Sequence, residues 1–271
     1  LIFGLFGVPK MGIQGAAAAT VFGQIVAMFL ALILNHAKNK EVRINFRSFT
    51  PNWRTISIIY QVGVPSIIMQ SISSVMTFGM NKILIGFSET AVAVFGVYFK
   101  LQSFIFMPIF GLNNGMIPIV AYNYGARSKK RIMETVWLSI GIAVGIMLIG
   151  LMVFHLMTPQ LLTLFQADEE MLAIGVPALR IISLSFLFAG YCIIVGSVFQ
   201  ALGNGVYSLI ISVARQLVCI LPLAWFFART FGLHAVWLSL PLAEITSVVL
   251  SSVLFRKIYL DKIKPLGQPA A

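Results

Sequence analysis

The sequence predicts an all-α membrane protein, a polytopic bundle of helices. Hydrophobic residues make up 59% of its 271 residues and charged residues only 10%, whereas a soluble domain carries about 25% charged residues. Several uncharged stretches reach the roughly 20 apolar residues that a helix needs to cross the hydrocarbon core of a bilayer. No stretch alternates apolar and polar residues for long, which excludes membrane-barrel strands.

The spans follow one another along the chain with short breaks between them. Residues 1–9 indicate the end of a helix that starts upstream and stops at the breaker cluster Gly7–Gly12. The turn residues Gly203, Asn204 and Gly205 divide an apolar run that is otherwise too long for one span. We expect seven complete helices, at 11–35, 55–86, 90–122, 133–157, 172–201, 206–228 and 232–256.

Basic residues predict how these helices are oriented, because they accumulate in cytoplasmic loops. The segment 36–54, the cluster at 127–131 and the tail after 255 together hold 13 of the 19 basic residues. The opposite side receives only two basic residues, Lys10 and Arg229, together with Glu89 and the acidic trio 168–170. We therefore expect a multi-pass protein of the inner (plasma) membrane with a cytoplasmic C-terminus. The net charge of +11 lies in these loops and indicates no nucleic-acid partner.

The first complete span resembles the last. When Gly12 is aligned on Gly232, Gln24 meets Glu244. Both spans run in the same direction through the membrane, which favours two parallel repeats. The predicted domains are the end of a first lobe (1–36), an inter-lobe linker (37–54), a six-helix lobe (55–257) and a tail (258–271).

Several short motifs carry a resemblance to a known family. They are "GIQGAAAAT" after a helix break, "GVPSIIMQ" opening the next span, "PIFGLNNGMIPIVAYNYGA" before a basic cluster, "FQALGN" and "PLAEI". The chain resembles the multidrug and toxic compound extrusion (MATE) family, near its bacterial DinF-like branch, over the family's sixth to twelfth helices. The most specific motif lies at 108–126.

The resemblance implies a V-shaped pair of six-helix lobes, alternating access, and export of amphipathic, often cationic small molecules by cation antiport. This chain would be the C-terminal six-helix lobe with the last helix of the N-terminal lobe, so a missing N-terminal lobe is an expected partner beside the lipid bilayer. The helix expected at 55–86 contains no acid, whereas the family's sodium-coupled branch carries a glutamate there. The proton is therefore favoured over sodium as the coupling cation.

Ionisable residues deep in a span are candidates for function, because burying a charge there is costly. Glu244 lies about twelve residues from either end of the last span. Without a partner, its carboxylate could exchange a proton and attract a cationic drug. Alternatively, it forms a structural ion pair with Arg215 or Lys100, and those two cations are further candidates.

Polar and aromatic side chains in the spans are candidates to line a central cavity, or else to bond neighbouring helices or pack against them. These candidates are Gln70, Asn81, Gln102, Asn113, Asn114, Gln200, Gln216 and Tyr98.

Two prolines and two glycines fall within the third complete span. Pro108 and Pro118 each remove a backbone donor, and Gly111 and Gly115 permit bending or close helix approach. Freed carbonyls at this depth need cover from protein or a watery cavity. The pattern predicts a helix that bends beside a cavity.

The sequence offers no constellation for an enzyme. Its three histidines are far apart and its two cysteines lack metal-ligand spacing, so we expect no enzymatic activity, no metal site and no cofactor. Two alternatives to drug export stay open here. One is a lipid-linked oligosaccharide flippase of the same superfamily, and the other is a half-transporter fragment that does not transport.

Overall fold

A computed structural model describes residues 11–38 and 50–267 of the chain. These residues fold into helices and form no strand. The predicted helix end at 1–9 and most of the predicted linker at 37–54 lie outside the described residues. The chain divides into two units, 1–56 and 57–271, and each is described by itself.

The first unit contains one long apolar helix, α1 (Gly12–Lys38). Gly12 at its start has a φ of 54°, and Gly232, the residue aligned with it in the last span, has a φ of 81°. Glycine adopts this left-handed conformation without the strain that a side chain would cause. The shared backbone geometry agrees with the alignment of the two spans.

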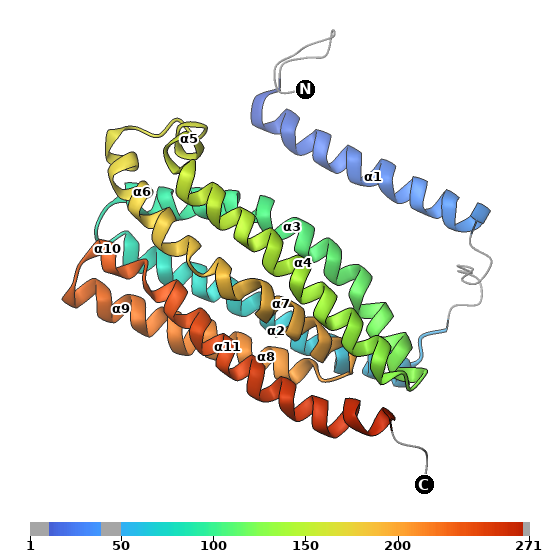
Figure 1. Cartoon of the computed structure of the whole chain (residues 1–271). Coiled ribbons are helices and arrows are strands. Elements are labelled where there is room, and N and C mark those ends of the chain that lie inside the picture. The colour runs from blue at the N-terminus through green and yellow to red at the C-terminus, as the bar shows by residue number, and fades with distance from the viewer. Residues whose placement is uncertain (1–10, 39–49, 268–271) are drawn as a thin grey trace. The chain divides into compact units, whose positions relative to one another are not determined.

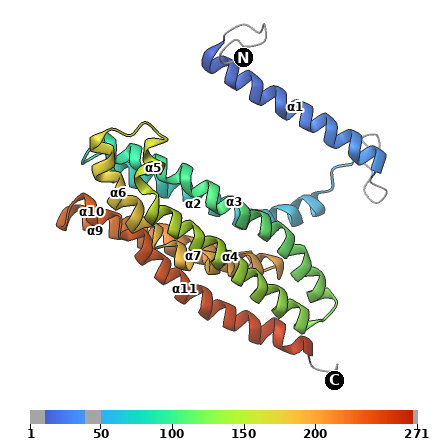
Figure 2. The ribbon, with the colours of Figure 1, turned by 45° about the horizontal axis from the view of Figure 1, so that its top comes forward.

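The second unit is a lobe of helices that run roughly along a shared direction (Figures 1 and 2). In chain order its elements are α2 (Trp53–Leu84), which begins just before the unit boundary, α3 (Glu89–Gly125), α4 (Lys129–Leu156), α5 (Thr158–Thr163), α6 (Glu169–Ser183), α7 (Phe186–Ala201), α8 (Gly205–Val213), the π-helix η3 (Ala214–Ile220), α9 (Leu221–Thr230), α10 (Leu233–Val236), α11 (Ser239–Ile258), the π-helix η4 (Tyr259–Ile263) and the 3₁₀-helix η5 (Lys264–Gly267).

The two ends of the lobe differ in charge. The α3–α4 turn and the end of α11 lie at one end of the bundle, and α5 and α10 lie at the other (Figure 1). Lys129, Lys257 and Lys262 belong to the first end, where the ammonium of Lys262 donates to the carbonyl of Leu202 at 2.8 Å. At the second end Asp168 caps α6 by accepting from the Met171 N–H at 2.8 Å. Asp168, one of the acids expected opposite the basic loops, thus serves a local structural role.

The described residues contain five helices long and apolar enough to cross a membrane, or up to seven if each of two bent pairs counts as one span. The span expected at 172–201 is divided into α6 and α7, which are bent by 49°. The hydroxyl of Ser185 donates to the carbonyl of Ile182 at 2.7 Å at this break. A serine that bonds its own backbone in this way competes with the helical ladder. The prediction of one continuous helix there was wrong.

The last two spans contain local irregularities without being divided by a sharp bend. Residues 206–228 form α8, η3 and α9, and Pro222 near the start of α9 has no N–H to continue an α-helical ladder. Residues 232–256 form α10 and α11, with Ser239 donating to the Val236 carbonyl at 2.7 Å at the break. The short helix α5 was not expected at all. Gly205–Thr230 and Leu233–Leu266 nevertheless each count as one membrane-length helix, so the two predicted spans are present with local irregularities.

Small residues allow a close contact between α4 and α7. A Cβ placed on Gly190 of α7 would lie 3.1 Å from the backbone carbonyl of Ala143 on α4. Helices in a membrane associate largely by such close packing, since lipid supplies no hydrophobic drive between them. The buried aromatic rings of Phe154 and Phe186 pack nearby with centroids 5.2 Å apart.

Candidate functional site

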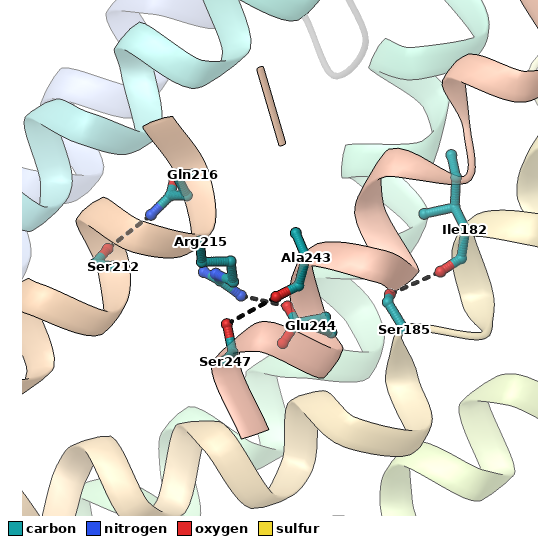
Figure 3. Close-up of polar contacts among 8 residues, drawn as sticks. All are labelled: Ile182, Ser185, Ser212, Arg215, Gln216, Ala243, Glu244 and Ser247. Atoms are coloured by element: carbon teal, nitrogen blue, oxygen red, sulfur yellow. Dashed lines mark hydrogen bonds and ion pairs between the residues drawn. The ribbon is translucent and has the colours of Figure 1, made fainter. Parts of the chain in front are cut away.

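An ion pair lies inside the lobe between η3 and α11. Nη1 of Arg215 is 2.5 Å from Oε1 of Glu244, and Figure 3 shows the two side chains pointing toward each other from their helices. The Glu244 side chain is 8% exposed and the Arg215 side chain is 32% exposed. The ion pair that the sequence offered as an alternative for Glu244 therefore exists, with Arg215 rather than Lys100 as the partner.

Local structure explains how the two residues meet. Arg215 and Gln216 lie on η3, whose hydrogen bonds run from residue i to i+5 and whose insertion into helices is frequent at functional sites. Glu244 follows the break between α10 and α11. The amide of Gln216 donates to the hydroxyl of Ser212 at 2.7 Å, one turn earlier (Figure 3). Three polar side chains are thus presented to the interior from one interrupted helix.

A cavity of about 460 Å³ lies on one side of the ion pair. Five of the predicted candidates line it: Gln70, Asn113, Asn114, Gln200 and Arg215. Sequence reasoning missed four serines of the lining, Ser197, Ser208, Ser212 and Ser247. The spacing of four between Ser208, Ser212 and Gln216 marks one helix face and could have identified part of this surface.

A smaller cavity of about 150 Å³ lies beside Glu244. The predicted candidates Tyr98, Gln102, Gln216, Arg215 and Glu244 line it, together with the rings of Phe99 and Phe106. Tyr98 is almost completely buried there, at 2% exposure. Arg215 lines both cavities, whereas Glu244 lines only the smaller one. The ion pair therefore lies between the larger cavity, which polar side chains line, and the smaller cavity, which aromatic side chains line.

Two candidates lie elsewhere. Asn81 lines a third, open pocket of about 470 Å³, which also receives Gln70. Lys100 is exposed on α3 and does not line any of these three cavities. In the described lobe, these three cavities therefore do not bring Lys100 together with Arg215.

The bend candidates lie on α3, which passes through Pro108 and Pro118 as one helix and changes direction along its length in Figure 2. A Cβ on Gly111 or Gly115 would meet no atom within 4 Å. These two glycines therefore accommodate no close neighbour in the described lobe. Asn113 lies between them, is buried, and faces the larger cavity.

Two buried oxygen atoms at the cavities have no hydrogen-bond partner among the described residues. They are Oδ1 of Asn113 and Oε2 of Glu244. A buried polar atom without a partner is costly, so such atoms usually receive water, a proton or a ligand. Among residues 11–38 and 50–267, no group of three or more histidine, cysteine or acidic side chains could hold a metal ion.

Comparisons with known proteins agree with this architecture. The MatE family model matches residues 65–226. A multidrug export protein, MepA, of Staphylococcus haemolyticus is 27% identical over 244 residues, which cover 90% of this chain and 53% of that protein. The chain therefore spans about half the length of the curated relatives it matches.

Two solved structures extend the similarity to the fold. A MOP superfamily transporter from Pyrococcus furiosus, described as having a binding pocket of reverse polarity, is 26% identical with a TM-score of 0.84, over 99% of this chain and 60% of that chain. An outward-facing multidrug resistance MATE transporter gives 26% identity and a TM-score of 0.84, over 98% and 59% of the two chains.

Proposed function

Because this chain belongs to the MatE family of multi-pass membrane transporters, we propose that it acts in a secondary transporter that exports amphipathic, often cationic compounds. The exchange is driven by entry of a cation, which we take to be the proton. In this proposal residues 55–257 form one lobe of the transporter. A second lobe completes the substrate pathway, and the two move against each other to give alternating access.

The proposal rests on the carboxylate of Glu244. One oxygen pairs with Arg215, and the other is buried with no hydrogen-bond partner among the residues that the structure describes. The cavity beside it is lined by the aromatic side chains of Tyr98, Phe99 and Phe106, a residue type that suits an organic cation. A protonated carboxyl loses most of its attraction for that cation. Proton and substrate therefore exclude each other at one group, which is the simplest form of antiport.

The alternative of a lipid-linked oligosaccharide flippase is not favoured. A cavity that holds a pyrophosphate would need several unpaired cations. Lys100 lies outside the described cavities, and Arg215 is paired with Glu244.

The test is cation efflux by the full-length gene product, measured with ethidium in inverted vesicles over a range of pH. Glu244→Gln keeps the shape of the side chain and fixes its neutral state. We expect slower efflux with a flattened pH dependence and unchanged membrane insertion. Arg180→Gln, which removes an exposed charge from α6 outside both cavities, is the matched control. Efflux by a stable Glu244→Gln protein with the wild-type pH profile would remove Glu244 from the coupling mechanism.

A further inference from the structure

The two neighbouring cavities contain one positive and one negative side chain, and the two differ in their surroundings. Arg215 is the charged residue of the larger cavity, and Glu244 is the acid of the smaller one. The guanidinium, at 32% exposure, faces both spaces, whereas the carboxylate, at 8%, faces only the smaller. Among the described lining residues, the larger cavity contains no acid.

Protonation of Glu244 changes the net charge of this region from neutral to positive. The remaining charge belongs to Arg215, whose guanidinium carries five N–H donors, and the bond to Glu244 Oε1 is the hydrogen bond that the described structure gives it. The hydroxyl of Ser212 accepts from Gln216, which leaves its own hydrogen for a ligand in the same cavity. An oxyanion is the ligand that this set of donors matches.

We propose that the larger cavity binds the oxyanion group, a carboxylate or phosphate, of an anionic ligand on Arg215, and that Glu244 takes up a proton when the ligand binds. This site lies beyond the proposed cation export, since it adds a second class of ligand with the opposite pH dependence. The proposed anion site depends on the ion pair and on the larger cavity. It does not depend on which compounds the transporter exports.

The need to keep the buried region neutral explains why Glu244 takes up a proton when the anion binds. When the oxyanion binds Arg215, the contact between Arg215 Nη1 and Glu244 Oε1 breaks. The buried carboxylate of Glu244 is then left without its counter-ion. A buried unpaired charge is far more costly than a buried neutral group. A proton from water binds the Glu244 carboxylate, so ligand and proton enter as a neutral pair. The ligand therefore binds more tightly as the pH falls, whereas a cation that competes for Glu244 binds more tightly as the pH rises.

Two other ionisable side chains interact electrostatically with Glu244. They are Tyr98 from α3 and Cys192 from α7. Phenol and thiol groups are ordinarily neutral near neutral pH. The remaining described residues that line the two cavities, from α2, α8 and α11 as well, are uncharged. The charge of the region is therefore set by the protonation of Glu244.

The experiment uses the full-length protein in detergent and measures binding of benzoate and phenyl phosphate by titration calorimetry. Benzyl alcohol is the neutral probe. Titrations in buffers of different ionisation enthalpy count the protons taken up. We expect both anions to bind at least about tenfold more tightly in acidic than in alkaline buffer, with proton uptake in the alkaline range and no such change for the alcohol.

The variants separate the roles of the two residues. Arg215→Gln should weaken anion binding by roughly tenfold or more, which is what one charge-assisted hydrogen bond contributes. Arg215→Lys should retain part of the binding, and Arg180→Gln all of it. Glu244→Gln should bind the anions without proton uptake and without pH dependence, because Arg215 is then permanently free.

A lipid headgroup and a soluble compound both carry such oxyanions, so the titrations are repeated in nanodiscs. Competition by phosphatidylglycerol, but not by zwitterionic phosphatidylcholine, would identify an anionic lipid headgroup as the occupant, and benzoate binding as tight in both lipids as in detergent would identify a soluble ligand. Undiminished benzoate binding by Arg215→Gln, or binding by the wild type without proton uptake, would overturn the proposal. Either result would leave cation efflux and its dependence on Glu244 untouched.

Discussion

The ion pair between Arg215 and Glu244 should be unequally sensitive to loss of its two partners. Arg215→Gln leaves a carboxylate that is only 8% exposed, and removing one partner of a buried pair costs about 3–5 kcal/mol. Glu244→Gln leaves a guanidinium that is 32% exposed beside a cavity of about 460 Å³. Water can hydrate that group, so the cost should be smaller, about 1–2 kcal/mol. The double variant should regain much of the stability that Arg215→Gln loses.

Thermal unfolding of the full-length protein in detergent measures this difference. A thiol-reactive fluorophore reports the exposure of the free cysteines Cys192 and Cys219. At about 2–4 °C per kcal/mol for a domain of this size, Arg215→Gln should lower the apparent Tm by about 10 °C and Glu244→Gln by about 4 °C. Acid should reduce the defect of Arg215→Gln, because a protonated Glu244 carries no charge. Equal effects of the single variants, or effects that simply add in the double variant, would refute this account of the pair.

Three further outcomes are expected. Gly190→Ala should destabilise the protein by about 1–3 kcal/mol, because its new Cβ would lie 3.1 Å from the Ala143 backbone. Gly111→Ala should not destabilise it, because the new Cβ would have no atom within 4 Å. Thermal unfolding of the two variants measures this difference. With the native cysteines replaced, a cysteine at position 167 should react with an impermeant thiol reagent from outside intact cells and one at position 128 should not, and the reverse pattern would contradict the predicted topology. Vesicles that contain only the 271-residue chain should not export ethidium at the rate of the full-length gene product, since alternating access needs a second lobe.

The sequence alone was sufficient to predict the helices and their order, because the signal for a membrane span is a long apolar stretch that needs no tertiary information. It was insufficient to predict the interruptions. The hydroxyls of Ser185 and Ser239 bond nearby carbonyls where the helices are bent or irregular, yet serines elsewhere in the lobe make the same kind of bond inside regular helices, as Ser247 does. Which serine ends a helix depends on the packing around it.

The candidate site was partly predictable for a similar reason. An acidic residue in the middle of an apolar span is easily recognised in a sequence, so Glu244 was identified as a candidate. Arg215 was one of two cations proposed as its partner. The choice between Arg215 and Lys100 depends on which face of each helix points inward, and η3 changes that facing in a way that a regular helical period does not describe. The serines of the larger cavity were missed because single hydroxyls are common in membrane helices and carry little signal.

The π-helix η3 also has a consequence for how this region tolerates insertions and deletions. Because its hydrogen bonds run from i to i+5, it contains one residue more than the same helix would need with α-helical bonds. Deleting one residue between Ala214 and Ile220, other than Arg215 or Gln216, would return the segment to α-helical bonding while α8 and α9 keep their facing. The same deletion inside α9 would turn everything after it by about 100°, exchanging buried for lipid-facing side chains. In evolutionary terms, η3 is the place on this span where chain length can change without reorienting the rest of the helix.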